Sequence, residues 1–301
     1  MPSMKTDRLP SMKKMENKLL IQTQAAKAFN VKKDDVVVVE RLLGGMSHLT
    51  YRIRINDVDY TFRIIGKGGN LYVDRTIELE NIKRIEPLEL NNDTVYFDVE
   101  SGEKAALFIE GTVLTQTDFV PHLKEVADTL KKLHYGNVEP VNDYGLIDRL
   151  SLYESYTNNR SPLYLNLKDK WIKLYSEKYE QNPKVFCHND AQRSNMVIAK
   201  DRLYLLDWEY AGLNEFYYDI ASFGNVNFDD ALQLLDVYLE RKATKEEQDH
   251  VRFYRMFQAL QWHQVALYKE QIGLSEVLKF DFALLANKYL ALAESLYQEM
   301  G

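Results

Sequence analysis

Residues 187–223 read CHNDAQRSNMVIAKDRLYLLDWEYAGLNEFYYDIASF. This stretch places His188, Asp190 and Asn195 in the spacing H-x-D-x-x-x-x-N, and Asp207 follows Asn195 by twelve residues. A short apolar run directly precedes Asp207 and predicts a strand that ends at this carboxylate. A loop, a strand and a carboxylate in this order are typical of a phosphoryl-transfer site.

The residue types in this motif suit that chemistry. Phosphoryl transfer needs an acceptor in line with the leaving phosphate and neutralisation of the phosphate charge. We expect Asp190 to orient the acceptor hydroxyl or take its proton, and Asn195 and Asp207 to bind magnesium through oxygen. We expect His188 to brace the loop by hydrogen bonding. A lone H-x-D is common, and an aspartate in a turn needs no function. The span from Asp190 to Asn195 and the following strand favour the catalytic interpretation.

Composition bounds the class of protein. The chain has 301 residues, enough for two lobes, and its hydrophobic fraction of 46% can form a substantial core. The formal net charge of −7 argues against a nucleic-acid partner and against a surface for anionic membranes. An acidic enzyme can still bind ATP through local cations and magnesium, and its charge favours a cationic acceptor.

The first fifteen residues are polar and basic, with scattered methionines. They predict a disordered tail over residues 1–15 and not a signal peptide. We find no stretch of the sequence with the length and apolarity of a transmembrane helix. The single cysteine, Cys187, excludes a disulfide within the chain and suits a reducing compartment, so we expect a cytoplasmic protein.

Strand patterns dominate the region before Gly111. A helix is expected at 17–29, and a five-stranded antiparallel sheet, interrupted by a helix at 74–85, is expected over residues 35–43, 49–55, 60–65, 94–99 and 105–109. After Gly111 the pattern changes to helices, with the catalytic hairpin among them. The sequence therefore predicts an α+β fold with a small lobe over residues 16–111 and a larger, mainly helical lobe over residues 112–301.

Three signals define the helical part. Apolar residues from Leu123 to Leu133 form one face of a helix that ends at Gly136. A second helix is expected over 165–178. Thr244 and Glu247 form a capping box that opens another helix.

The smaller lobe carries candidate nucleotide contacts. Gly44, Gly45, Met46 and Ser47 connect two expected strands. Such a turn lets backbone N–H groups approach a phosphate, but the same residues also make an ordinary hairpin. Arg63 lies between apolar neighbours on the third strand, where kinases keep their phosphate-binding cation.

The partner of Arg63 stays open at this point. Glu78, on the following helix, could pair with it, and Glu80 is a rival. Residues 108–111 are expected to form a hinge in which Ile109 offers backbone groups to adenine.

The segments 44–51, 187–190 and 206–210 carry a family resemblance, together with Asn214 and Asp219. The chain resembles choline kinases, particularly the bacterial LicA-like branch, over roughly residues 35–270. The resemblance implies a two-lobed protein-kinase-like fold. It also implies transfer of the ATP γ-phosphate to the hydroxyl of choline, with magnesium.

By motif position, the resemblance implies a catalytic aspartate at Asp190, metal ligands at Asn195 and Asp207, and a phosphate-binding cation at Arg63. Gln192 matches a glutamine found beside the acceptor in many choline kinases. Asp219 is expected to brace the catalytic loop.

The acceptor pocket follows from the chemistry of a quaternary ammonium. Such a group cannot donate a hydrogen bond, so aromatic faces and carboxylates must hold it. We expect Glu209, Tyr210 and Trp262 to contact a cationic small-molecule alcohol, although Glu209 could equally bond backbone in its turn. The family usually has a second tryptophan where this chain has Val265, and an acidic residue where it has Val226. Both departures weaken the case for choline itself.

Several functions compete. A choline kinase leads, with ethanolamine or another amino alcohol as the near variant. An aminoglycoside or thiamine kinase shares the loop and the hairpin. A protein kinase is disfavoured, because residues 207–209 lack the glycine of D-F-G and no A-P-E follows. A catalytically dead homologue is disfavoured, because Asp190, Asn195 and Asp207 are all present. The acceptor and the oligomeric state stay open at this stage.

Overall fold

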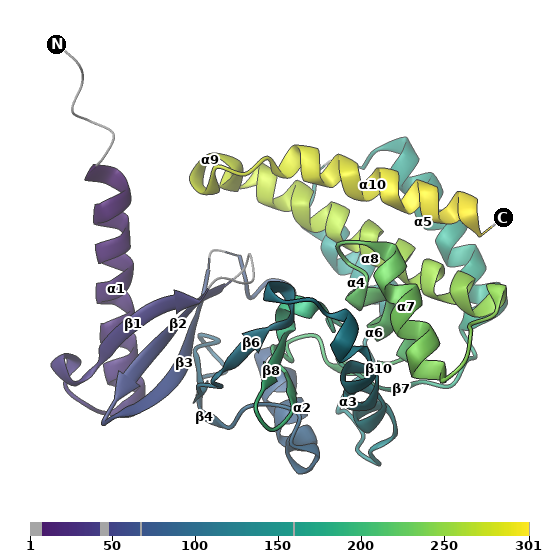
Figure 1. Cartoon of the computed structure of the whole chain (residues 1–301). Coiled ribbons are helices and arrows are strands. Elements are labelled where there is room, and N and C mark those ends of the chain that lie inside the picture. Colours follow the sequence, from purple (N-terminus) through teal and green to yellow (C-terminus); the bar gives the residue numbers. More distant parts are fainter. Residues whose placement is uncertain (1–7, 43–47, 67, 159, 301) are drawn as a thin grey trace. The chain divides into compact units, whose positions relative to one another are not determined.

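The chain divides into two compact units, Met1–Leu79 with Asn91–Gly111 and Glu80–Leu90 with Thr112–Gly301. The structure is a computed structural model, and it describes residues 8–42, 48–66, 68–158 and 160–300 (Figure 1). Within these residues, we find no helix whose length and apolarity would suffice to cross a membrane.

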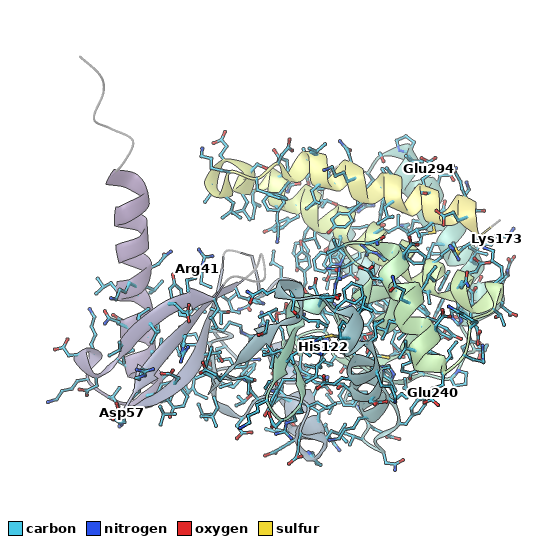
Figure 2. All side chains as sticks on the ribbon, in the orientation of Figure 1. Arg41, Asp57, His122, Lys173, Glu240 and Glu294 are labelled. Atoms are coloured by element: carbon cyan, nitrogen blue, oxygen red, sulfur yellow. The ribbon has the colours of Figure 1, made fainter. Side chains whose placement is uncertain are left out.

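The smaller unit is built on a five-stranded antiparallel sheet, as predicted. The spatial order is β1-β2-β3-β5-β4, and the strands are β1 (Val37–Leu42), β2 (His48–Ile55), β3 (Val58–Ile65), β4 (Thr94–Phe97) and β5 (Lys104–Leu107). Asn56 and Asp57 both have positive φ and form the tight turn between β2 and β3, where Figure 2 labels Asp57. The helix α2 (Arg75–Ile85) interrupts the sheet between β3 and β4.

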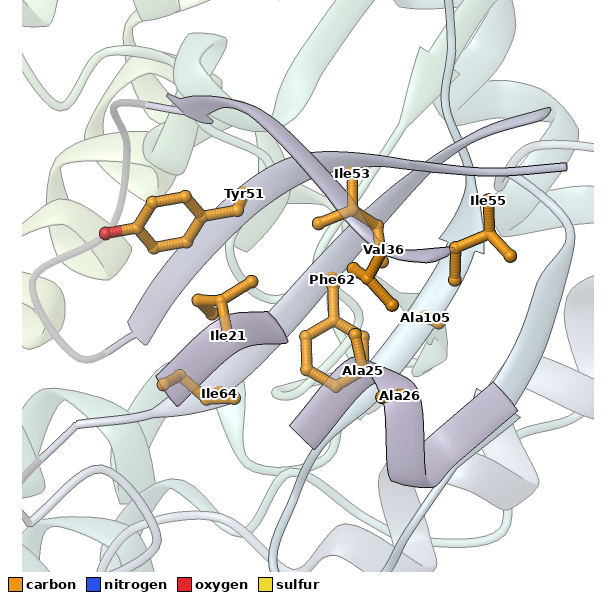
Figure 3. Packing of buried hydrophobic residues seen from close by; sticks show 10 residues of the cluster. All are labelled: Ile21, Ala25, Ala26, Val36, Tyr51, Ile53, Ile55, Phe62, Ile64 and Ala105. Carbon is orange, nitrogen blue, oxygen red and sulfur yellow. The ribbon is translucent and has the colours of Figure 1, made fainter. Parts of the chain in front are cut away.

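One face of this sheet is covered by α1 (Arg8–Phe29). Ile21, Ala25 and Ala26 of this helix are buried with residues from the sheet and its approach (Figure 3), namely Val36, Tyr51, Ile53, Ile55, Phe62, Ile64 and Ala105. The predicted disordered tail over residues 1–15 is wrong from Arg8 onward, because α1 begins there. Residues 8–16 are rich in lysine and methionine, which favour helix. The helix therefore begins well before the part of α1 that packs against the sheet. Residues 1–7 lie outside the described range.

The two units divide after Gly111, where the sequence placed the boundary, but the segment Glu80–Leu90, expected in the small lobe, belongs to the larger unit. Long-range hydrogen bonds explain the difference. The Asn81 amide donates to the Asn142 side chain at 2.8 Å and to the Ala211 carbonyl at 2.9 Å. The carbonyl of Leu90 accepts from the Leu205 N–H at 2.8 Å.

The larger unit is mainly helical. Its further helices are α3 (Leu123–Tyr135), α4 (Leu146–Ser155), α5 (Pro162–Leu174), α6 (Phe216–Phe223), α7 (Phe228–Leu239), α8 (Lys245–Gln271), α9 (Leu274–Leu278) and α10 (Phe282–Glu299). The predicted apolar face of α3 is buried, and the capping box of Thr244 and Glu247 opens α8. The helix α10 runs alongside α8 (Figure 1).

Short helical turns also occur in both units. Within the described residues, 3₁₀ turns cover Lys33–Asp35, Glu86–Leu88, Leu114–Gln116, Val120–His122 and Arg193–Asn195, and a π-helical turn covers Tyr175–Tyr179. Two small sheets carry the segment with the predicted catalytic residues. In the first, β7 (Val185–Cys187) pairs with β10 (Gly212–Asn214). In the second, β8 (Met196–Ala199) pairs with β9 (Leu203–Leu205), and β6 (Gly111–Val113) lies beside β8.

Candidate active site

The loop after β7 is held at its base by Asp219, near the centre of α6. The two carboxylate oxygens of Asp219 accept the backbone N–H groups of His188 at 2.8 Å and Asn189 at 2.7 Å. The ring of His134 lies 3.1 Å from the same carboxylate. Asp219 is fully buried and every one of these contacts is internal, which confirms that it braces the loop.

His188 ties the loop to the strand that delivers Asp207. Its Nδ1 accepts the N–H of Asp190 at 3.2 Å, and its Nε2 lies 3.0 Å from the carbonyl of Leu206. Because Nδ1 is an acceptor, the proton of the neutral ring belongs on Nε2, where it is donated to Leu206. This arrangement supports the expected bracing role.

Asn189 adds a third anchor that the sequence analysis did not predict. Its φ of 61° is left-handed, a conformation that asparagine tolerates better than most residues. Its amide donates to the carbonyls of Tyr210 at 3.1 Å and Gly212 at 3.2 Å, and its Oδ1 accepts from Asn214 at 2.8 Å. The available signal in the sequence was the asparagine between His188 and Asp190, because asparagine suits a left-handed turn at this position.

Asp190 is the point where the loop's hydrogen bonds converge. Its Oδ2 accepts from Gln192 Nε2 at 3.0 Å and from Asn195 Nδ2 at 2.9 Å. Burial raises the pKa of Asp190 well above its ordinary value, and the negative charges of Asp207 and Glu209 raise it further. The hydrogen bonds from Gln192 and Asn195 act in the opposite direction and lower it. The side chain is therefore oriented through one oxygen and lies among other negative charges.

Asn195 and Asp207 are brought together by the β8–β9 hairpin. The carbonyl of Asn195 accepts the N–H of Leu206 at 2.7 Å, and Asp207 follows in a left-handed conformation with a φ of 68°. The amide nitrogen of Asn195 is taken by Asp190, so its oxygen is the atom left for a cation. An amide oxygen and a carboxylate are hard donors that fit magnesium.

In the smaller unit, Arg63 on β3 forms a buried ion pair with Glu78. The two nitrogen–oxygen distances are 2.8 and 3.0 Å, whereas Glu80 pairs with Lys83 on the surface, so Glu78 is the partner. Burial alone would raise the pKa of Glu78, but Arg63, Lys104 and Arg75 together hold it below its ordinary value.

The other residues predicted to contact the nucleotide are Gly44, Gly45, Met46, Ser47 and Ile109. Gly44, Gly45, Met46 and Ser47 lie outside the described residues. Ile109 follows the end of β5 at Leu107, in the connection that leads to β6, and its side chain is half-buried.

A model of the choline/ethanolamine kinase family matches residues 39–254. The chain belongs to the choline/ethanolamine kinase family. Protein LicA of Haemophilus influenzae is 27% identical to it over 248 residues, which cover 77% of this chain and 73% of that protein. A solved structure of LicA in complex with AMP has a TM-score of 0.77 at 21% identity and covers 94% of this chain and 99% of its own. The choline kinase LicA from Streptococcus pneumoniae has a TM-score of 0.72 at 22% identity, with coverages of 91% and 99%.

These similarities confirm the predicted family and the predicted α+β, protein-kinase-like fold. Membership in the choline/ethanolamine kinase family makes the chain a phosphotransferase by class. The residues around Asp190 can then be compared with the acceptor contacts that the sequence predicted.

In this choline/ethanolamine kinase homologue, Gln192 bridges two side chains. Its Nε2 donates to Asp190, and its Oε1 accepts from the Asn225 amide at 2.6 Å. Glu209 is half-buried, and its charge acts on Asp190 and on Lys269 of α8. Asn225 and Lys269 were not predicted, because no local pattern shows that Asn225 reaches Gln192, 33 residues earlier, or that Lys269 of a separate helix is influenced by Glu209.

Tyr210 is buried beside an internal cation. The guanidinium of Arg149 lies 5.3 Å from the Tyr210 ring centre and 4.1 Å from that of Tyr144. Burial raises the pKa of Tyr210 well above its ordinary value. The Arg149 guanidinium therefore lies close to the rings of Tyr144 and Tyr210. The sequence had predicted that Tyr210 contacts a cationic acceptor.

The other predicted acceptor residue, Trp262, lies half-buried on α8. Val265, one turn later, is buried. Val226 is 77% exposed in the connection between α6 and α7, next to the Asn225 that reaches Gln192. Neither valine can supply the aromatic face or the carboxylate that the family usually has there.

Proposed function

We propose that this protein transfers the γ-phosphate of ATP to the hydroxyl of a small cationic alcohol, choline or ethanolamine, with magnesium. The observation that carries the proposal is the environment of Asp190. Gln192 and Asn195 both donate to its Oδ2, so Oδ1 is the oxygen left for an acceptor hydroxyl. Held in this way, Asp190 would orient the hydroxyl for in-line attack and receive its proton as the new bond to phosphorus forms.

Magnesium would be held by the side-chain oxygens of Asn195 and Asp207. The ion, when bound, neutralises charge on the nucleotide phosphates. Asn195 then has two tasks, because its nitrogen supports Asp190 while its oxygen serves the cation. His188 would keep the loop and the hairpin at a fixed spacing.

The smaller unit would bind the nucleotide. Arg63, Arg75 and Lys104 surround the single carboxylate of Glu78, which leaves this cluster net positive. Such a charge suits the α- and β-phosphates, and the ion pair with Glu78 would fix the direction of the Arg63 guanidinium. We propose backbone groups of Gly44, Gly45, Met46 and Ser47 as further phosphate contacts, and of Ile109 as the adenine contact.

The acceptor would bind through charge and aromatic surface. Asp190, Asp207 and Glu209 give the site a negative potential that favours a cation. We propose that Glu209, Tyr210 and Trp262 contact the ammonium group. Val226 and Val265 leave this environment with fewer contacts to methyl groups, so we expect weak discrimination between choline and ethanolamine.

The test is turnover of purified protein with MgATP against choline, ethanolamine, thiamine and an aminoglycoside. We expect phosphorylation of choline and ethanolamine, and Asp190→Asn should lower kcat by roughly 10²–10⁴-fold, the range for a positioned acid or base. Asp201→Asn, an exposed aspartate in the β8–β9 hairpin, is the matched control and should keep wild-type kcat. If Asp190→Asn kept more than about a tenth of kcat, Asp190 would not have this role.

A further inference from the structure

Arg255 is a buried arginine on α8 that belongs to no ion pair among the described residues. Its exposed fraction is 2%, and its Nε has no hydrogen-bond partner there. Burial lowers the pKa of Arg255. A buried charge without a counter-charge is costly, so the contacts that this guanidinium does make are informative.

Those contacts lead to the end of α6. Arg255 Nη2 donates to the carbonyl of Asn225 at 3.0 Å, and Nη1 donates to the Gln258 side chain at 3.2 Å. Gln258 in turn donates to Ser222 Oγ at 2.8 Å, and the N–H of Asn225 donates to the Ser222 carbonyl at 3.2 Å. Gln258 therefore bonds the last turns of α6, and Arg255 bonds the connection just after it, so α8 fixes this end of α6.

Asn225 connects the end of α6 to the loop that carries Gln192 and Asp190. Its backbone is held by Arg255, and its side-chain amide donates to Gln192 Oε1 at 2.6 Å. An amide can turn by 180° and exchange its oxygen and nitrogen. The Asp190 carboxylate accepts Nε2 of Gln192 at 3.0 Å, and the Asn225 amide, which donates to Oε1, anchors Gln192 in this orientation. In the other orientation, two oxygens with partial or full negative charge would face each other.

A second observation concerns a side chain on which both Arg255 and Asp190 act. Tyr289 of α10 is half-buried. Burial raises the pKa of its hydroxyl, and the charges of Arg255 and Asp190 both act on this group. The two charges therefore act on the same side chain, although neither group bonds the other among the described residues.

We propose that Arg255 and Asn225 are positioning residues, which fix the amide of Gln192 and through it the orientation of Asp190 toward the acceptor hydroxyl. The inference rests on the proposed function, because that function gives Asp190 its role. It goes beyond it by assigning the acceptor-side orientation to residues that touch neither substrate nor metal.

The test is a double-mutant cycle on kcat. Asn225→Ala changes an exposed side chain, so the variant should fold. It should lower kcat roughly tenfold, the effect expected for loss of one orienting hydrogen bond, with little change in the KM for ATP. Gln192→Ala should have a similar effect, and adding Asn225→Ala to it should change kcat less than twofold. A purely structural role of Asn225 predicts instead that the two losses multiply.

Arg255 is tested by a conservative pair. Arg255→Lys can still donate to the Asn225 carbonyl and should keep at least half of kcat, whereas Arg255→Met should match Asn225→Ala. Arg252→Met is the control, because Arg252 lies on the same helix and pairs with Asp249 and Glu299. Wild-type kcat in both folded Asn225→Ala and Arg255→Met would overturn the inference.

A crystal structure of Asn225→Ala separates this inference from the proposed function. We expect the Gln192 amide to leave Asp190 Oδ2. An unchanged Gln192–Asp190 hydrogen bond would overturn the positioning role whatever the acceptor is. A wild-type protein that phosphorylates neither choline nor ethanolamine would overturn only the proposed acceptor.

Discussion

Lys269 offers a perturbation whose size can be worked out from its surroundings. It lies on α8 with an exposed fraction of 6%, and its ammonium has no hydrogen-bond partner among the described residues. Its Nζ is 5.6 Å from the ring centre of Phe282 on α10. Burial lowers the pKa of Lys269 from 10.5 to about 8, although the negative charge of Glu209 acts to raise it.

This shift sets both the magnitude and the sign of the expected effect. At about 1.4 kcal/mol per pKa unit, it corresponds to about 3 kcal/mol. The folded state disfavours the charged amine, so the cost is present in full below pH 8. It declines between about pH 8 and 10.5 and is absent above. Lys269→Met keeps the chain length without the charge. It should therefore stabilise the larger unit by up to about 3 kcal/mol at pH 7 and by almost nothing at pH 10.5.

Urea unfolding followed by tryptophan fluorescence measures this, because Trp171, Trp208 and Trp262, the three tryptophans of the chain, all lie in the larger unit. Lys245→Met is the control, since Lys245 is exposed at the start of α8 and should change stability by no more than about 0.5 kcal/mol at any pH. A less stable Lys269→Met, or a difference that is equal at pH 7 and pH 10, would refute the reasoning.

The same substitution links stability to the acceptor. Removing the ammonium removes a positive charge that acts on Glu209, so the KM for a cationic alcohol should fall at pH 7. The difference from wild type should close above pH 8, where wild-type Lys269 loses its proton. The KM for ATP serves as the internal reference and should stay constant.

Two further outcomes are expected at the site. Asp207→Ala should abolish magnesium-dependent ATP binding in calorimetry, whereas Asn195→Ala should weaken it less and still lower kcat severely; unchanged affinity in Asp207→Ala would place the metal elsewhere. Trp262→Ala should raise the KM for choline by roughly 10-fold, or about 1.4 kcal/mol, in steady-state kinetics with the KM for ATP unchanged. Equal turnover of choline and neutral alcohols would contradict a cationic acceptor.

The fold was predictable wherever a local signal governs structure. The Asn56-Asp57 turn fixed the β2–β3 hairpin, and the Thr244 capping box marked the start of α8. The helix α4 was missed, because it begins after Gly145 without a side-chain cap and carries no clear start signal. The assignment of Glu80–Leu90 to the larger unit was not predicted, because Asn81 finds its partners about 60 and 130 residues later in the chain, which no local pattern reveals.

The site divides in the same way. Asp190, Asn195 and Asp207 could be predicted because one loop and one hairpin carry them, so their spacing in sequence constrains their spacing in space. Arg255, in contrast, reaches the Asn225 carbonyl from a separate helix, and an arginine among apolar residues carries no sign of which carbonyl it will meet. A motif therefore identifies the groups that we propose for the chemistry. The groups that we propose to orient them are found only when the chain is folded, because each contact joins a donor to an acceptor 30 residues or more away in sequence.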